Sequence, residues 1–249
     1  MPPTTERNPA LVPDTVPNRF LGATDWDDPR YAALRCVFEE IYRDELGGEP
    51  HRFGARDPGQ VVIHWSREWE YPWAVLNAEI VPGMRVCDLG CGGSPLLPYL
   101  AGRCGCVCWG LDSQFPISAR HNLRYFAEDP RTQFPEITWL EEDMAELSLP
   151  DSSMDRIFCI SVLEHVSEDV MRRTMAQIHR VLRPGGRALI TTDVTGDHRT
   201  LTVGYEQIIE ESRGQGLDLH GDADLSERGE TPGTYSVVGF VLRKPGATH

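Results

Sequence analysis

Residues 86–94 read VCDLGCGGS, and this stretch decides the fold. The apolar run that ends at Leu89 predicts a buried β-strand over 85–89, and a cluster of glycines follows it directly. Glycine has no Cβ, so the backbone of such a turn can pass close to a ligand. In an open α/β sheet, ligands bind at this place, beyond the carboxyl ends of the strands.

Short apolar strands and helices alternate downstream of this turn. The spacing of apolar residues predicts helices over 95–101, 117–126, 168–182 and 205–212, and strands over 107–111, 137–140, 156–160, 187–192 and 235–242. Strand–helix alternation is typical of a mostly parallel, doubly wound α/β sheet that is covered by helices on both faces. Residues 81–249 are therefore expected to form one α/β domain.

The first 80 residues have a different pattern. Residues 1–27 are rich in proline and predict a loose arm, whereas Asp28-Pro29 is typical of a helix start. The segment HWSREWEYPW, residues 64–73, contains three tryptophans, and Pro72 is expected to break or restart its helix. We therefore expect residues 1–80 to form an arm and a helical cap, or lid, on the domain.

Charge and composition limit the classes of partner. The 24 basic and 38 acidic side chains give a net charge of −14, which disfavours binding to phosphate backbones. A small-molecule substrate is therefore expected, and binding to a nucleic acid is not. No apolar run approaches the roughly 18 residues that span a bilayer, and the first residues lack a signal core. We expect a cytoplasmic protein with no membrane partner.

The cysteines also favour a reducing compartment. Their number, 7, is odd, and the chain is long enough to fold without disulfides. Cys104, Cys106 and Cys108 alternate along the chain, which favours packing on one buried face over a metal site.

The glycine turn fits two classes of cofactor, dinucleotides and S-adenosylmethionine (SAM). A dinucleotide places its pyrophosphate at the helix N-terminus behind the turn, where the charge of Asp88 would oppose it. SAM carries a cationic sulfonium, which a carboxylate favours. In addition, Pro95 stands where the dinucleotide fingerprint G-x-G-x-x-G requires its last glycine. SAM is therefore the expected cofactor.

Acidic residues also follow the next two predicted strands. Asp112 follows Gly110-Leu111, where a carboxylate can accept hydrogen bonds from both ribose hydroxyls. Asp143 follows the strand over 137–140, where it can accept from an adenine amino group while Met144 contacts the ring.

Taken in order, these motifs resemble class I SAM-dependent methyltransferases. The matching pieces are VCDLGCGGS, GLD, EED-M, DRIFCISVLEHV and LRPGGRALITT, which together cover roughly residues 81–193. One departure is Ser94, which stands at the third glycine of the family motif. The resemblance implies a seven-stranded sheet with an antiparallel C-terminal strand, and a cofactor site formed by Asp88, Gly90, Cys91, Gly92, Asp112, Ser113, Asp143, Met144, Ile160 and Ser161.

The chemistry of methyl transfer suggests further candidates. His165, next to Glu164, titrates near neutrality and is a candidate general base, with helix packing as the alternative. Some relatives bind Mg²⁺ through a Glu-x-x-Glu-His run, but Ser161 replaces its first Glu, so no metal is expected. Arg67 in the lid is the candidate for the cofactor carboxylate. The candidates for the acceptor pocket are Trp65, Trp69, Tyr71, Trp73 and His198.

For the lid aromatics, the competing interpretation is a hydrophobic seam that holds the cap on the sheet. The sequence thus predicts a SAM-dependent methyltransferase acting on an O, N or C atom of a small molecule, and the expected setting is bacterial secondary metabolism. The alternatives are a methyltransferase for tRNA or protein, a SAM-binding protein without transfer activity, and a nicotinamide-dependent reductase. The oligomeric state is not determined by the sequence.

Overall fold

The computed structural model describes residues 12–46, 51–52, 62–63, 66–113, 129–195, 204–226 and 235–246. The predicted helix over 117–126 lies outside these ranges. Five parallel strands form the centre of the sheet in the order β6 (Thr138–Glu141), β5 (Val107–Asp112), β4 (Arg85–Leu89), β7 (Met154–Ile160) and β8 (Leu182–Thr195). The antiparallel strand β11 (Tyr235–Arg243) follows β8. The predicted mostly parallel sheet with an antiparallel C-terminal strand is confirmed.

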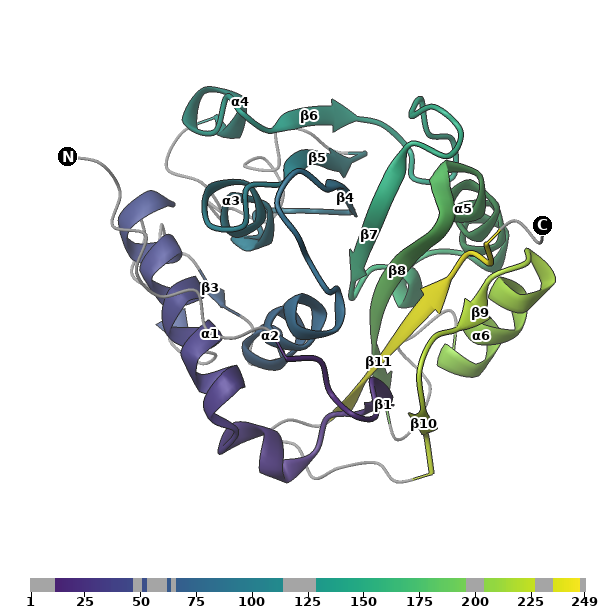
Figure 1. Cartoon of the computed structure of the whole chain (residues 1–249), viewed down its shortest axis with the longest axis horizontal. Helices are drawn as coiled ribbons and strands as arrows, with labels where there is room; N and C mark the ends of the chain where they lie inside the picture. The colour runs from purple at the N-terminus through teal and green to yellow at the C-terminus, as the bar shows by residue number, and fades with distance from the viewer. Residues whose placement is uncertain are drawn as a thin grey trace.

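Helices cover both faces of this sheet (Figure 1). Helices α1 (Pro29–Glu40), α2 (Arg67–Asn77) and α3 (Leu96–Gly102) lie on one side, and α5 (Glu168–Val181) and α6 (Tyr205–Gly214) on the other. Successive residues of β7 alternate between the two cores: Phe158 packs with the first group of helices, whereas Ile157 and Cys159 pack with the second. Both faces of the central strands are therefore buried, as in doubly wound folds.

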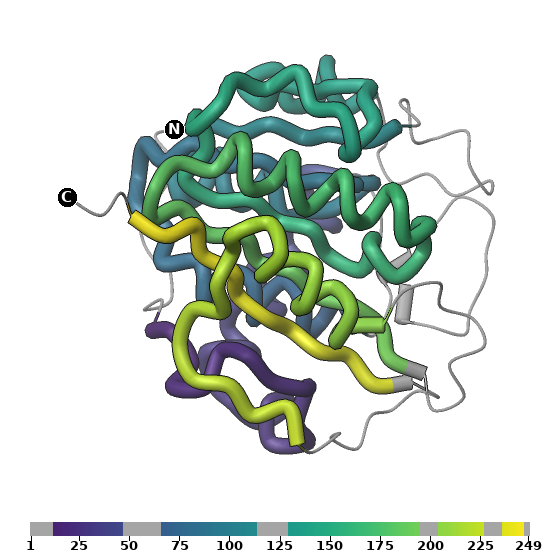
Figure 2. The backbone as a smooth tube through the Cα atoms, turned by 90° about the vertical axis from the view of Figure 1, so that its right-hand side faces the viewer, coloured from purple at the N-terminus to yellow at the C-terminus, as the bar shows by residue number. Residues whose placement is uncertain are grey.

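The described sheet has nine strands because short segments extend its C-terminal side. Strand β1 (Asn18–Phe20) pairs with β11 and with β10 (Ala223–Asp224), and β9 (Asp218–Leu219) also pairs with β11. Figure 2 shows the N-terminal segment beside the chain around residue 224. The expectation of a loose arm is wrong for residues 18–26, because β1 and the short 3₁₀ helix η1 (Ala23–Trp26) are ordered against the sheet.

The predicted start of α1 is confirmed, whereas the predicted break at Pro72 and the predicted start of β8 are wrong. Asp28 caps α1 by accepting from the backbone N–H of Arg30 at 2.8 Å. Pro72, however, lies inside a continuous α2. Burial of that helix from Trp69 to Asn77 stabilises it despite the backbone hydrogen bond that proline cannot donate. Likewise, β8 begins at Leu182, before the strand predicted over 187–192, and its residues 183–186 are bulged, with Gly185 at φ +80°.

The remaining described elements are peripheral. A π-helical turn, η2 (Ile41–Glu45), continues α1; β2 (His51–Arg52) pairs with β3 (Val62–Ile63); α4 (Pro130–Gln133) precedes β6; and the 3₁₀ turn η4 (Leu163–His165) follows β7. All seven cysteines are free, and Cys104, Cys106 and Cys108 are buried in one core, as predicted. Within the described ranges, no helix has the length and apolar composition that crossing a membrane requires.

Candidate functional site

The carboxyl ends of the parallel strands meet at one edge of the sheet, and the candidate site residues follow them there. The turn after β4 folds back over β5: the backbone N–H groups of Gly90 and Cys91 donate to the carbonyl of Leu111 at 2.8 and 3.0 Å. The N–H of Gly92 donates to Oδ2 of Asp112, at the end of β5, at 3.3 Å. These bonds hold the glycine turn beside the first two strand tips.

Two glycines of the turn adopt conformations that favour glycine. Gly90 has φ +67°, and a Cβ there would lie 2.7 Å from Cγ2 of Val162. Gly92 has φ +50°, and a Cβ there would meet no atom within 4 Å. Gly90 is thus required by packing, whereas the space beside Gly92 is open to a ligand. Ser94 does not have positive φ, and its hydroxyl accepts from the N–H of Leu96, so this departure from the motif is accommodated.

Asp88 is not the ionised carboxylate that we expected from the sequence. It is only 2% exposed, and burial raises its pKa to about 8, although Arg67 opposes the shift. Without a bound cationic ligand, Asp88 therefore favours its neutral form at pH 7. A sulfonium or ammonium group would favour ionisation, so the pocket remains compatible with SAM. The exclusion of dinucleotides depends more on Pro95 and on the shape of the turn.

The predicted adenine side lies after β6. Asp143 is exposed, and its Oδ1 accepts from the N–H of Ala145 at 2.9 Å, while Met144 is buried beside it. Ser113 is exposed after β5, and Ile160 is buried at the end of β7. The structure thus places these residues on three strand tips along the same edge.

A buried polar cluster connects α2 to the tips of β7 and β8. Arg67 forms an ion pair with Glu70 inside α2. Oε1 of Glu70 accepts from the hydroxyls of Ser161 at 2.5 Å and Thr191 at 2.6 Å. Burial alone would raise the pKa of Glu70, but Arg67 and the two hydroxyls outweigh it and lower the pKa. Glu70 is therefore fully buried and is paired through both carboxylate oxygens.

Glu164 and His165, the candidate catalytic pair, lie beside a second acid, Asp193, which was not among the residues predicted from the sequence. Oε1 of Glu164 accepts from the N–H of Asp193 at 3.0 Å, and Nε2 of His165 lies 3.9 Å from the same oxygen. Oε2 of Glu164 is buried and has no partner among the described residues. One ligand atom from each of the three residues lies within 4.8 Å of the others, close enough to share a cation. Asp193 follows the predicted strand over 187–192, so the rule that identified Asp112 would also have found it.

Protonation in this trio follows from burial. Burial raises the pKa of Glu164 to about 8, with a further contribution from Asp193. Burial and the charge of Glu70 raise the pKa of Asp193 to about 7, against the opposing effect of Arg67. Burial and Arg67 lower the pKa of His165, which leaves a neutral imidazole at pH 7. A neutral imidazole is the form that can accept a proton.

The lid aromatics that the structure describes are all buried, which favours a hydrophobic seam over an acceptor pocket. Trp69 and Trp73 are fully buried, and their indole N–H groups donate to Asp25 at 2.8 Å and to the carbonyl of Pro17 at 3.0 Å. They form the seam between cap and sheet, so they do not wall an open pocket. Tyr71 is also buried, near Phe38 and Ser94. The candidates Trp65 and His198 lie outside the described residues.

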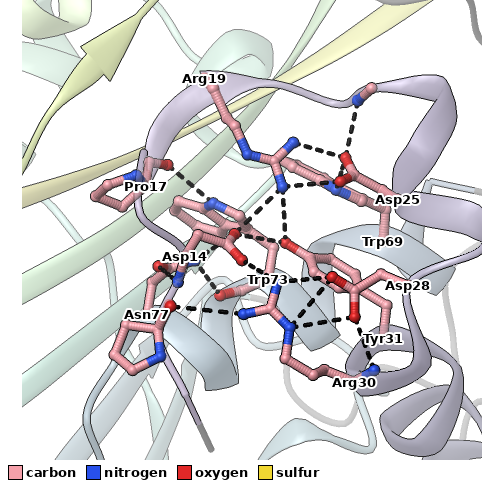
Figure 3. A network of polar contacts seen from close by, with 12 residues as sticks. Asp14, Pro17, Arg19, Asp25, Asp28, Arg30, Tyr31, Trp69, Trp73 and Asn77 are labelled. Carbon is pink, nitrogen blue, oxygen red and sulfur yellow. Dashed lines mark hydrogen bonds and ion pairs between the residues drawn. The ribbon is translucent and has the colours of Figure 1, made fainter.

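A cavity lies away from this edge. It has a volume of about 510 Å³ and lies under the N-terminal segment, where its charged lining residues are Asp14, Arg19, Asp25, Arg30 and Asp224. Its charged groups from the N-terminal segment already pair with one another, as Figure 3 shows. This cavity therefore contributes nothing to the candidate site.

Comparison with known proteins gives one consistent picture. Residues 87–190 match the family model described as a methyltransferase domain. Ubiquinone biosynthesis O-methyltransferase from Pseudomonas syringae pv. tomato is 28% identical over 142 residues, which cover 57% of this chain and 58% of that protein. The chain spans only 58%, 34% and 60% of the lengths of three curated relatives that it matches.

Solved structures match over a larger part of the chain. The crystal structure of the [4+2]-cyclase SpnF has a TM-score of 0.60 at 16% identity, covering 95% of this chain and all (100%) of that one. The Burkholderia thailandensis 1,6-didemethyltoxoflavin-N1-methyltransferase was solved with 1,6-didemethyltoxoflavin and S-adenosylhomocysteine bound. It has a TM-score of 0.55 at 19% identity, and the match covers 87% of this chain and 89% of that one. At these identities the likeness establishes the fold alone.

Proposed function

Residues 87–190 form a class I, SAM-dependent methyltransferase domain, and from this premise we propose that the protein transfers the methyl group of SAM to an O, N or C atom of a small molecule. The observation that carries the proposal is the glycine turn between Asp88 and Asp112. Its open side at Gly92 and the half-buried carboxylate of Asp112 fit an adenosyl ligand.

The proposed cofactor site follows the strand tips in order. Gly90, Cys91 and Gly92 would pass their backbone along the methionine part, and Asp112 would accept from the ribose hydroxyls. After β6, Asp143 and Met144 would flank the adenine. The remaining proposed contacts come from Arg67, Asp88, Ser113, Ile160 and Ser161.

Bound SAM would supply an activated methyl group on a cationic sulfur. The chain's own tasks are then orientation, exclusion of water and proton transfer. For an acceptor that loses a proton, His165 is the proposed base, because its imidazole is neutral at pH 7 and exposed at the same edge. Glu164, whose Oε1 lies 3.9 Å from Nε2 of His165, would orient the ring.

The small-molecule part of the proposal depends on charge and on the relatives. A net charge of −14 opposes a nucleic-acid acceptor. The relatives include a ubiquinone biosynthesis O-methyltransferase, a sterol 24-C-methyltransferase from Yarrowia lipolytica and the 1,6-didemethyltoxoflavin-N1-methyltransferase. The free cysteines agree with a reducing compartment, so we place the protein in the cytoplasm.

Calorimetric titration tests the proposal. The full chain is expected to bind SAM and S-adenosylhomocysteine (SAH) and not NAD. Binding of NAD without binding of SAH would refute the proposal. A panel of small acceptors with phenol, amine or activated-carbon groups, followed by detection of SAH release, then tests transfer itself.

A further inference from the structure

Glu70 is an ionised side chain in the middle of the cap helix, with an exposed fraction of 0%. Its partners come from three elements: Arg67 in α2, Ser161 after β7 and Thr191 in β8. Both hydroxyls donate to Oε1, and the guanidinium donates to Oε2. Because Oε1 accepts from the two hydroxyls and Oε2 accepts from the guanidinium, the carboxylate is fixed in one orientation.

Arg67 is held by this carboxylate on one edge only. Its Nη1 donates to Glu70 and, at 3.5 Å, to the hydroxyl of Ser66. Its Nε and Nη2 make no hydrogen bond to the residues that the structure describes, and the side chain is 24% exposed. A guanidinium has five donors in a planar fork, so a free edge can bind a carboxylate through two parallel hydrogen bonds.

Arg67 lies close to the ends of β7 and β8, because its ion-pair partner Glu70 accepts from Ser161 and Thr191. The guanidinium affects the protonation of Asp88 before the glycine turn, of His165 after β7 and of Asp193 in β8. Through Glu70, the cap helix thus brings a cation close to the strand ends that carry the candidate site residues.

The backbone beside Glu70 is also strained. Ser161 has φ +50°, a left-handed conformation that a non-glycine residue adopts at a cost. Such strain persists where the surrounding structure imposes it. Here the strained residue directs its hydroxyl at Glu70, which indicates that this contact is part of the site's architecture.

We propose that Glu70 is a positioning residue: it holds the Arg67 guanidinium at the glycine turn, so that the cofactor site selects ligands that carry the α-carboxylate of SAM. The inference rests on the proposed function and assigns a task to a residue that touches no ligand itself. It implies that a shortened adenosine ligand without the amino-acid part gains nothing from the Arg67–Glu70 pair.

The substitution Glu70→Gln tests this directly. The new amide oxygen can still accept from Ser161 and Thr191, but its NH₂ group faces the guanidinium, donor against donor, and displaces it. We expect calorimetry to show SAH binding weakened by about tenfold or more. Binding of 5′-methylthioadenosine, which shares the adenosine and the thioether but lacks the amino acid, should change by less than about twofold, because the lost interaction involves only the carboxylate.

Two further variants isolate the mechanism. Glu68→Gln, on the same helix, removes the same charge from a half-buried position and should leave the ratio of the two affinities unchanged. In an Arg67→Met background, Glu70→Gln should cause no further selective loss of SAH affinity, because the group that it positions is gone.

The outcomes separate this inference from the proposed function. If the wild-type protein binds neither ligand, the proposed function fails. If it binds both but SAH gains nothing over 5′-methylthioadenosine, or if Glu70→Gln weakens both equally or neither, the positioning role is refuted. Should Glu70→Gln fail to fold in a thermal scan, Thr191→Val keeps both charges, removes one donor and should weaken SAH alone by about threefold. An equal effect of Thr191→Val on both ligands would also refute the role.

Discussion

The indole N–H of Trp69 donates to Oδ2 of Asp25 at 2.8 Å, across 44 residues of sequence. The same carboxylate accepts from both Nη atoms of Arg19, at 2.6 and 2.9 Å, and from the backbone N–H of Gly22 at 2.8 Å (Figure 3). One buried acid therefore joins β1, the turn after it and the cap helix that carries Arg67 and Glu70. It is one of the contacts that hold the cap on the sheet, beside the bond from Trp73 to the carbonyl of Pro17.

Replacing Asp25 is expected to destabilise the fold strongly. Asp25→Ala leaves the Arg19 guanidinium, which is only 19% exposed, without its main partner. Removing one member of a buried ion pair costs about 3–5 kcal/mol, and the indole also loses its acceptor. Urea denaturation should show this loss in the free energy of unfolding. Asp27→Ala, at an exposed position nearby, is the control and should change it by less than about 0.5 kcal/mol. Equal effects of the two substitutions would contradict the role of Asp25.

The two glycines of the turn should respond differently to alanine. Gly90→Ala adds a Cβ that would lie 2.7 Å from Val162 and also strains a φ of +67°, so we expect a loss of roughly 2–5 kcal/mol in stability. Gly92→Ala meets no atom and should cost about 1–2 kcal/mol from backbone strain alone. Thermal or urea unfolding measures both. Adding Val162→Ala should recover part of the first loss only; recovery in neither case would show that the clash is not the cause.

Asp112 is expected to matter for ligand binding. Asp112→Ala removes the acceptor proposed for the ribose hydroxyls and the partner of the Gly92 N–H. Because a hydrogen bond to a charged group contributes about 1.5–3 kcal/mol, SAH affinity should fall by at least about tenfold in calorimetry. Glu136→Ala, which removes an exposed acid elsewhere, should leave it unchanged. An unaltered affinity in Asp112→Ala would remove this residue from the site.

Asp88 should make stability depend on pH. Its pKa is about 8 in the folded chain but about 3.9 when unfolded, so the folded state binds an extra proton between these values. The wild-type protein therefore loses stability relative to Asp88→Asn as pH rises from about 4 to about 8, and the difference then levels off. Glu164 and Asp193, whose raised pKa values have the same sign, are present in both proteins and cancel in the comparison. Urea denaturation without ligand at about pH 5, 7 and 9 measures the difference; a difference that is constant across this range would contradict the buried acid.

The sequence predicted the parts of the site that lie on regular strands. Asp88, Asp112 and the glycines between them follow from the alternation of strands and helices, because parallel strands place their carboxyl ends at one edge. Asp193 obeys the same rule and was available to the same reasoning. Glu70 was not, because the helical pattern around it contains three tryptophans and a proline and does not reveal which face meets the sheet.

In the cap, the structure differs from what neighbouring residues in the sequence predict. Pro72 is a helix breaker by its own chemistry, yet α2 continues through it because burial of that helix outweighs one lost hydrogen bond. Residues 18–26 were expected to belong to a loose arm. Residues 18–20 instead pair with β11, because an edge strand presents unpaired backbone N–H and C=O groups to a neighbouring segment.

The sheet, the glycine turn and the expected class of ligand could be predicted from the amino-acid sequence. They depend on residue type and on the periodic spacing of apolar residues in strands and helices. Tertiary structure alone decided which lid residues are core and which face the strand tips, and it decided that Asp88 and Glu164 are held as weak acids. Burial and charge pairing depend on groups brought together from distant parts of the chain, and no local pattern encodes them.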